Sequence, residues 1–116
     1  MSEETRPPGK TTIAPDVLLS IARLTTLGVD GVSRLSGLTS VNDIFQRGQR
    51  SGGVRIHIKD NYVNIDLHVI LEQDVNIRQI SRSIQEEVTR AITEMVGMDI
   101  GQVNVHIEDI NYEREK

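Results

Sequence analysis

The chain has no cysteine and no tryptophan, and only one phenylalanine among its 116 residues. The lack of cysteine excludes disulfides, zinc–thiolate sites and thiol catalysis. Because aromatic residues are so few, the core must be built from Ile, Val, Leu and Met. Such a core offers few rings on which a base or a sugar could stack. These absences narrow the range of enzymes and nucleic-acid binders that the chain could be.

Positive charge is also in short supply, since the formal net charge is −4. This disfavours a general nucleic-acid binder, because neutralising phosphates needs a basic surface. No run of about 18 apolar residues is present, and the N-terminus lacks the apolar stretch of a signal peptide. We therefore expect a cytoplasmic protein that does not itself span a membrane.

The length predicts one domain of modest size. Residues 1–10 are polar and contain Pro7, Pro8 and Gly9, which predicts a disordered tail. Residues 11–110 form the expected domain, with a candidate short strand at its start (Thr11 to Ile13), and residues 111–116 form a flexible charged tail.

A first helix is predicted from Pro15, a residue favoured at the first helical position, to Leu27. Gly28 would end it in the left-handed conformation. Residues 29–53 are the least decided part, with a single helical turn as one option for 41–45. The predicted apolar stripe of the helix consists of Val17, Leu18, Ile21, Leu24 and Leu27.

Two runs of alternating apolar and polar residues, 54–59 and 62–69, flank Asp60 and Asn61. They predict a β-hairpin with a two-residue turn. A turn at 60–61 pairs apolar with apolar residues on one face and sets Arg55 opposite Asp66 on the other, whereas a one-residue slip destroys both matches. The predicted apolar pairs are Ile58 with Val63, Ile56 with Ile65, and Val54 with Leu67.

A second helix is predicted between Asn76, its N-terminal cap, and Gly97, with Gln79 completing a capping-box-like arrangement. Glu86 and Arg90 are four residues apart in the favourable order. A last strand follows, in which Val103, Val105 and Ile107 alternate with polar residues. The helix's predicted apolar stripe is Ile77, Ile80, Ile84, Val88, Ala91, Ile92 and Met95.

The resulting order, (β)-α-β-β-α-β, predicts an α+β fold: a two-layer sandwich with two helices packed on one face of a small mixed sheet. The other face is polar and is left for solvent or a partner. We take it as the candidate interaction surface, formed by Arg55, His57, Lys59, Asn64, Asp66, His68, Asn104 and His106.

The three histidines all fall on this polar face. In the hairpin register His57 lies opposite Asn64, so His68 is more than about 10 Å away along the neighbouring strand. His57 and His68 therefore cannot share a metal ion. Whether His106 approaches either of them depends on the order of the strands. Solvated sheet histidines are the favoured interpretation, and a pH-responsive face is the alternative.

No nucleotide fingerprint or catalytic constellation is present, so we expect neither a cofactor nor an enzymatic activity. Asp66 faces Arg55, which favours ion pairing over a raised pKa. A flexible basic loop with Arg47 and Arg50 is the remaining candidate for contact with a phosphate.

The ordered segments starting at Gly53, Val63, Val75, Ile84 and Val103, together with Ile21-Ala22 and Gly31-Val32, resemble the alkaline shock protein family of bacterial envelope stress response proteins. The resemblance covers about residues 11–110. It departs at Gln73-Asp74, where family members often carry an aromatic residue and a glycine, and this change affects the connection between strand and helix.

The resemblance implies a small cytoplasmic protein without known enzymatic activity. Some members self-assemble and attach to the membrane through a separate integral protein. We therefore expect a non-enzymatic stress-response or envelope-homeostasis protein that acts by protein–protein interaction or self-assembly, with an open sheet edge such as Gly53 to Lys59 as one template. The alternative is a small RNA-binding module that uses the basic stretch from Arg47 to Arg55.

Overall fold

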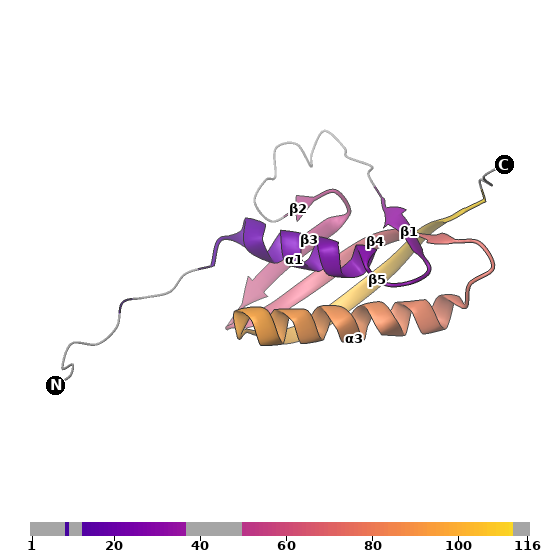
Figure 1. Cartoon of the computed structure of the whole chain (residues 1–116). Helices are drawn as coiled ribbons and strands as arrows, with labels where there is room; N and C mark the ends of the chain where they lie inside the picture. The colour runs from indigo at the N-terminus through magenta and orange to yellow at the C-terminus, as the bar shows by residue number, and fades with distance from the viewer. Residues whose placement is uncertain (1–8, 10–12, 37–49, 113–116) are drawn as a thin grey trace.

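The computed structural model describes residues 9, 13–36 and 50–112 of the chain. In this part, two helices lie over one face of a five-stranded sheet (Figure 1). The predicted two-layer α+β sandwich is thus confirmed. The elements, in chain order, are α1 (Pro15–Leu27), β1 (Val32–Leu35), β2 (Arg50–Ser51), β3 (Val54–Lys59), β4 (Tyr62–Glu72), α3 (Ile77–Val96) and β5 (Asp99–Asn111).

The predicted hairpin of β3 and β4 is confirmed residue by residue. Lys59 pairs with Tyr62 and Arg55 with Asp66, and the three apolar pairs are those that the alternation predicts. Asp60 and Asn61 have φ angles of 51° and 72°. Positive φ at both central residues is typical of the type I′ turn, whose twist matches that of the strands. The turn and the alternation therefore specify the same register.

The middle of the sheet is β4, which has neighbours along both edges. On one edge it pairs antiparallel with β3 and, further along, with β1, and on the other it pairs parallel with β5. The sheet is therefore mixed. The last strand is longer than the alternation of Val103 to Ile107 predicts, since β5 runs from Asp99 to Asn111.

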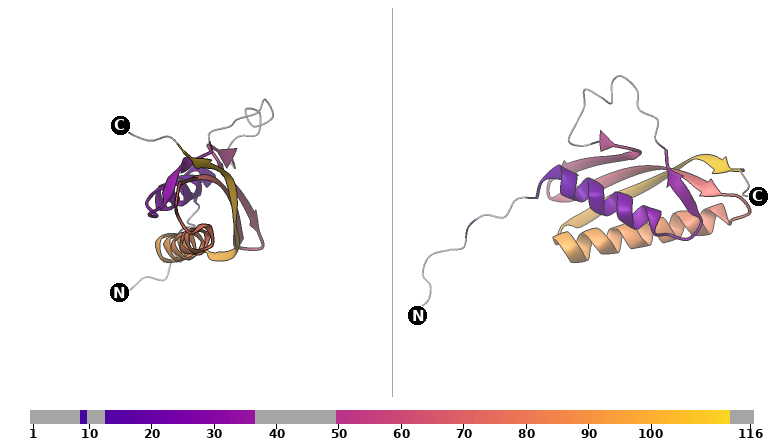
Figure 2. Two further views of the ribbon diagram at one scale, coloured as in Figure 1. Left: turned by 90° about the vertical axis from the view of Figure 1, so that its right-hand side faces the viewer. Right: turned by 45° about the horizontal axis from the view of Figure 1, so that its top comes forward.

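The predicted bounds of α1 are confirmed, but part of its predicted stripe is wrong. The buried residues are Leu18, Leu19, Ala22 and Thr26, whereas Val17 and Leu27 are exposed and Leu24 is 66% exposed. Because apolar residues occur on several sides of this helix, spacing alone does not select the buried side. Packing against both α3 and the sheet selects it instead (Figure 2). The Thr26 hydroxyl donates to the Ala22 carbonyl, which satisfies it inside the core.

The ends of α3 follow helix-capping rules more closely than the C-terminal end of α1 does. As predicted, the Asn76 side chain caps α3, accepting a hydrogen bond from the backbone N–H of Gln79, and Gly97 closes the helix, in the left-handed conformation. Gly28, in contrast, stays right-handed at the end of α1, so the predicted left-handed stop there is wrong. The middle of the predicted α3 stripe is buried, but Ile77 and Met95 at its ends are exposed.

Two further predictions have different outcomes. Arg90 pairs with Glu87, at 2.6 Å, rather than with Glu86, because the two side chains meet at a spacing of three residues. The candidate strand residues Thr11 and Thr12 and the candidate turn at 41–45 lie outside the described residues. Ile13 is described but is not part of a strand.

Gly53 lies where β1, β3 and β4 converge. Its carbonyl accepts a hydrogen bond from the His68 N–H, and the His68 carbonyl accepts one from the Ser36 N–H. A Cβ on Gly53 would lie 2.8 Å from the Ser36 carbonyl oxygen and 3.0 Å from that of His68, and its φ is +87°. Only glycine fits this junction without displacing backbone.

We predict that Gly53→Ala lowers the free energy of unfolding by about 2–4 kcal/mol, because it adds backbone overlap to the cost of positive φ. Gly52→Ala is the matched control. Gly52 also has positive φ, +46°, but nothing lies within 4 Å of its added Cβ, so its cost is about 1 kcal/mol. Urea unfolding of both variants measures the difference, and equal losses would contradict the role of the junction.

Candidate functional site

The polar face of the sheet lies opposite the helices. Its side chains come from three adjacent strands, β3, β4 and β5: Arg55, His57 and Lys59 lie on β3, Asn64, Asp66 and His68 on β4, and Asn104 and His106 on β5. Pairing sets Asp66 beside Asn104 and His68 beside His106. The residues predicted from the alternation therefore do share one face. Of the predicted basic loop, Arg47 lies outside the described residues and Arg50 begins β2, so the loop's contact with phosphate stays a prediction.

Asp66 is the centre of a hydrogen-bonded group on this face. Its Oδ1 accepts a hydrogen bond from Asn104 Nδ2 at 3.1 Å and from His106 Nε2 at 3.3 Å. Partial burial raises the pKa of the Asp66 carboxyl, but the two hydrogen bonds and the charges of His106 and Arg55 together hold that pKa below its ordinary value. Asp66 is thus an ionised acceptor, and its pKa is not raised, as expected.

His68 and His106 are stacked, with ring centroids 4.6 Å apart and planes inclined by 13°. His68 Nδ1 donates to Glu108 at 2.8 Å, whereas His106 donates to Asp66. Each imidazole is therefore directed to its own carboxylate. The remaining histidine, His57, accepts a hydrogen bond from Arg55 at 3.1 Å between Nε2 and Nη2.

The sequence did not predict which histidine His106 approaches, because this depends on the order of the strands. In the structure β5 pairs with β4, so His106 lies next to His68 and away from His57. Among the described residues, no group of three or more His, Asp or Glu side chains has the geometry to hold a metal ion. What the face provides is a set of charged and polar groups that hold one another in place. The candidate surface omitted Glu108, although the alternation sets it on the same side as Asn104 and His106. Its contact with His68 depends on the position of β5 beside β4.

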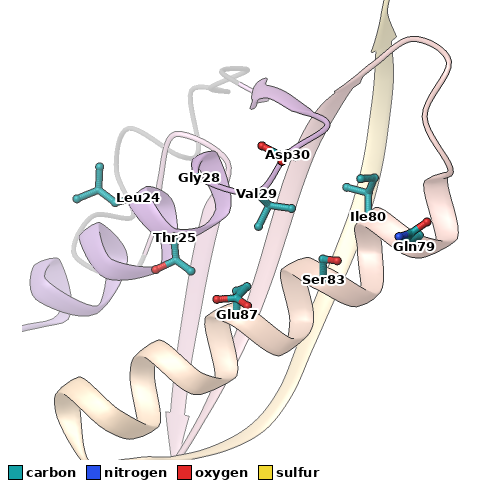
Figure 3. Close-up of a pocket in the computed structure, with 9 residues that line it drawn as sticks. All are labelled: Leu24, Thr25, Gly28, Val29, Asp30, Gln79, Ile80, Ser83 and Glu87. Carbon is teal, nitrogen blue, oxygen red and sulfur yellow. The ribbon is translucent and has the colours of Figure 1, made fainter.

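A second feature, which the sequence did not predict, is an open groove between the end of α1 and the first half of α3 (Figure 3). Its volume is about 610 Å³. Ile80, Ser83 and Glu87 come from α3, while Thr25 and Val29 come from α1 and the turn after it. Glu87 is already paired with Arg90. The groove is wide and of mixed polarity, and the exposed Leu24 at its rim is the signal that could have located it.

These features define the chain as a small two-layer α+β domain with a histidine-bearing sheet face that neither helix covers. The chain belongs to the alkaline shock protein 23 family, described as having a cell envelope-related function, whose model matches residues 3–112. The family resemblance seen in the sequence is thereby confirmed. No described helix is long and apolar enough to cross a membrane.

Two similar proteins come from bacteria. The uncharacterized protein YqhY of Bacillus subtilis (strain 168) is 30% identical over 107 residues, which cover 90% of this chain and 79% of the relative. The uncharacterized protein Spy1535 of Streptococcus pyogenes serotype M6 is 32% identical over 107 residues, covering 91% and 82%.

Among solved structures, a copper form of the MamM CTD matches with a TM-score of 0.52 and 13% identity, covering 87% of this chain and 91% of that one. A nickel form of a variant of the same domain has a TM-score of 0.50 and 14% identity, covering 86% and 99%. At these identities the likeness concerns the fold alone.

We predict that Asp66→Asn flattens the acid limb of the stability curve. Because the folded-state pKa of Asp66 is lowered, its ionised form stabilises the fold above the ordinary value of 3.8. This contribution is lost as the pH falls through the folded-state pKa. Between about pH 5 and pH 2 the wild type should lose about 0.5–1 kcal/mol more than the variant.

Urea unfolding at a series of pH values measures this difference. Glu86→Gln is the control, because it removes a carboxylate from the exposed side of α3 and leaves the polar face intact. A wild type and an Asp66→Asn variant that lose equal stability on acidification would contradict the account of Asp66.

Proposed function

We propose that this chain is a non-enzymatic protein-binding module of the cell envelope that holds a partner on the polar face of its sheet. The observation that carries the proposal is the hydrogen-bonded arrangement of Asp66, Asn104 and His106, and of His68 and Glu108, on a face that neither helix covers. Side chains that are already ordered lose less conformational entropy when a partner binds.

The charges of the face suggest the kind of surface that it binds. Arg55 and the exposed Lys59 lie on β3, whereas Asp66 and Glu108 lie toward β5. A partner with acidic groups over β3 and basic groups over β5 would match this arrangement, and such matching gives specificity more than affinity. The family's cell envelope-related function supports an envelope protein as the partner, and in this proposal the chain reaches the membrane from the cytoplasm through it.

We predict that a photo-crosslinking amino acid at His57 or Asn104 captures an envelope protein in living cells, because both side chains are exposed on the polar face. The same substitution at Arg82 or Glu86, exposed on α3, is the matched control. Mass spectrometry of the crosslinked bands identifies what is captured. Capture of the same protein from α3 only, or from all four positions equally, would contradict a binding site on the polar face.

A further inference from the structure

The outer edge of β5 is a second surface, which borders the polar face. β5, gold in Figure 1, pairs with β4 over its whole length, and no strand of the described residues pairs with its other edge. At 13 residues it is longer than β4, which has 11. A long strand with one unpaired edge is a template for a further strand.

The side chains of β5 on the helix side are incompletely buried. Leu67 and Val69 on β4 are fully buried, but Val105 and Ile107 beside them on β5 are only partly buried, as are Ile100 and Ile110 nearer its ends, and Val103 is the buried exception. The apolar layer therefore stops abruptly at this edge. A further strand there would cover the row.

The backbone of β5 is directed to receive such a strand. The Val103 carbonyl accepts a hydrogen bond at 3.1 Å from Gln85 of α3, a helix outside the ladder of β4 and β5, and we take this carbonyl to point to the open edge. Since alternate residues of a strand direct their N–H and C=O groups to the same side, those of Val105 point to the open edge too. The Val103 oxygen keeps a second lone pair, so Gln85 does not prevent pairing.

We propose that β5 pairs antiparallel with β5 of a second copy of this chain, with Val105 on the two-fold axis. Val105 is the midpoint of the strand Asp99–Asn111, so this register pairs the entire strand with its copy. Apolar residues meet apolar residues and polar residues meet polar ones. The pairs are Val105 with Val105, Val103 with Ile107, Ile100 with Ile110, Asn104 with His106, Gln102 with Glu108, and Asp99 with Asn111.

The acidic residues select this register over its neighbours. With Val105 on the axis, Asp99, Glu108 and Asp109 each face a neutral residue, whereas an axis at Asn104 sets Asp99 against Asp109 and Ile100 against Glu108. An axis at His106 sets Val103 against Asp109. Like charges directly opposite one another, and charges opposite apolar residues, disfavour both alternatives.

The two bulges of β5 fit the same register. One lies between the pairs of Ile100 and Gln102 with β4, and the other between those of Ile107 and Asp109. Each bulge shifts the alternation by one residue. Because the antiparallel copy brings one bulge next to the other, Ile100 and Ile110 remain on the same side of the sheet. The inference goes beyond the proposed function, since it names a second copy of the chain as the partner of the backbone edge of β5, whereas the proposed function concerns a different protein on the side chains of the polar face.

Because the native chain has no cysteine, single-cysteine variants test the register directly. Paired Val105 residues have Cα atoms about 5.5 Å apart, within disulfide reach, so Val105→Cys should form a covalent dimer under mild oxidation. A mixture of Asn104→Cys and His106→Cys should crosslink as a heterodimer. Gln102→Cys is the control, because its two copies lie about 20 Å apart. Crosslinking of Gln102→Cys as fast as Val105→Cys would overturn the register.

A charge pair at the edge gives a test that does not depend on cysteine. Gln102 is exposed and would face Glu108 of the copy twice in each dimer. Gln102→Glu should raise the dimer dissociation constant by about two- to tenfold, and Gln102→Lys should lower it by a similar factor. Light scattering over a wide concentration range measures both. Equal effects of the two variants would overturn the pairing.

A wild-type chain that stays monomeric at all concentrations would also overturn the pairing, but it would leave binding at the polar face intact. Conversely, a dimer whose polar face captures nothing would contradict the proposed function and leave the β5 pairing standing.

Discussion

The structure depends on the two-sided pairing of β4. Its helix-facing residues, Val63, Ile65, Leu67, Val69 and Leu71, are fully buried, and each contributes roughly 1.5–3 kcal/mol of apolar burial. The same strand aligns β3 and β1 on one edge and β5 on the other. Because side chains alternate along a strand, fixing the inward row of β4 also fixes which of its polar residues point outward. The register of β4 with its neighbours thus determines both which residues form the core and which form the polar face.

The elements that local chemistry determines could be predicted from the sequence. The hairpin register followed from the turn residues, the apolar pairs and the opposition of Arg55 and Asp66, and all of them point to one alignment. The Asn76 cap and the bounds of α1 were predicted from capping rules in the same way, although Gly28 ends α1 in the right-handed and not the left-handed conformation. The buried side of α1 could not be predicted, because apolar residues lie around much of the helix. Only the contacts of α1 with α3 and the sheet determine that Leu19 is buried and Leu24 is exposed.

In the candidate site, too, the features that depend on one strand or hairpin could be predicted, and those that depend on the order of the strands could not. Alternation within each strand predicted that His57, His68 and His106 share one face, and the hairpin register separated His57 from His68. The stacking of His68 on His106 depends on which edge of β4 takes the last strand, and alternation carries no information about neighbours. The alternation sets Glu108 on the same side as His106, but its pairing with His68 could not be predicted for the same reason, because it too depends on which strand lies next to β5.

The polar face and the open edge of β5 also share residues, and this joins the two proposals. Asn104 and His106 belong to the hydrogen-bonded group around Asp66, yet in the proposed dimer Asn104 of one copy lies beside His106 of the other. The two polar faces would then form one surface, with the stacked histidines of both copies near the two-fold axis. A partner bound across that axis would contact both copies at once, and binding at two linked sites strengthens attachment without any new contact type. A small domain with modest individual contacts can in this way hold an envelope protein firmly, provided that the partner itself presents two copies of the matching surface.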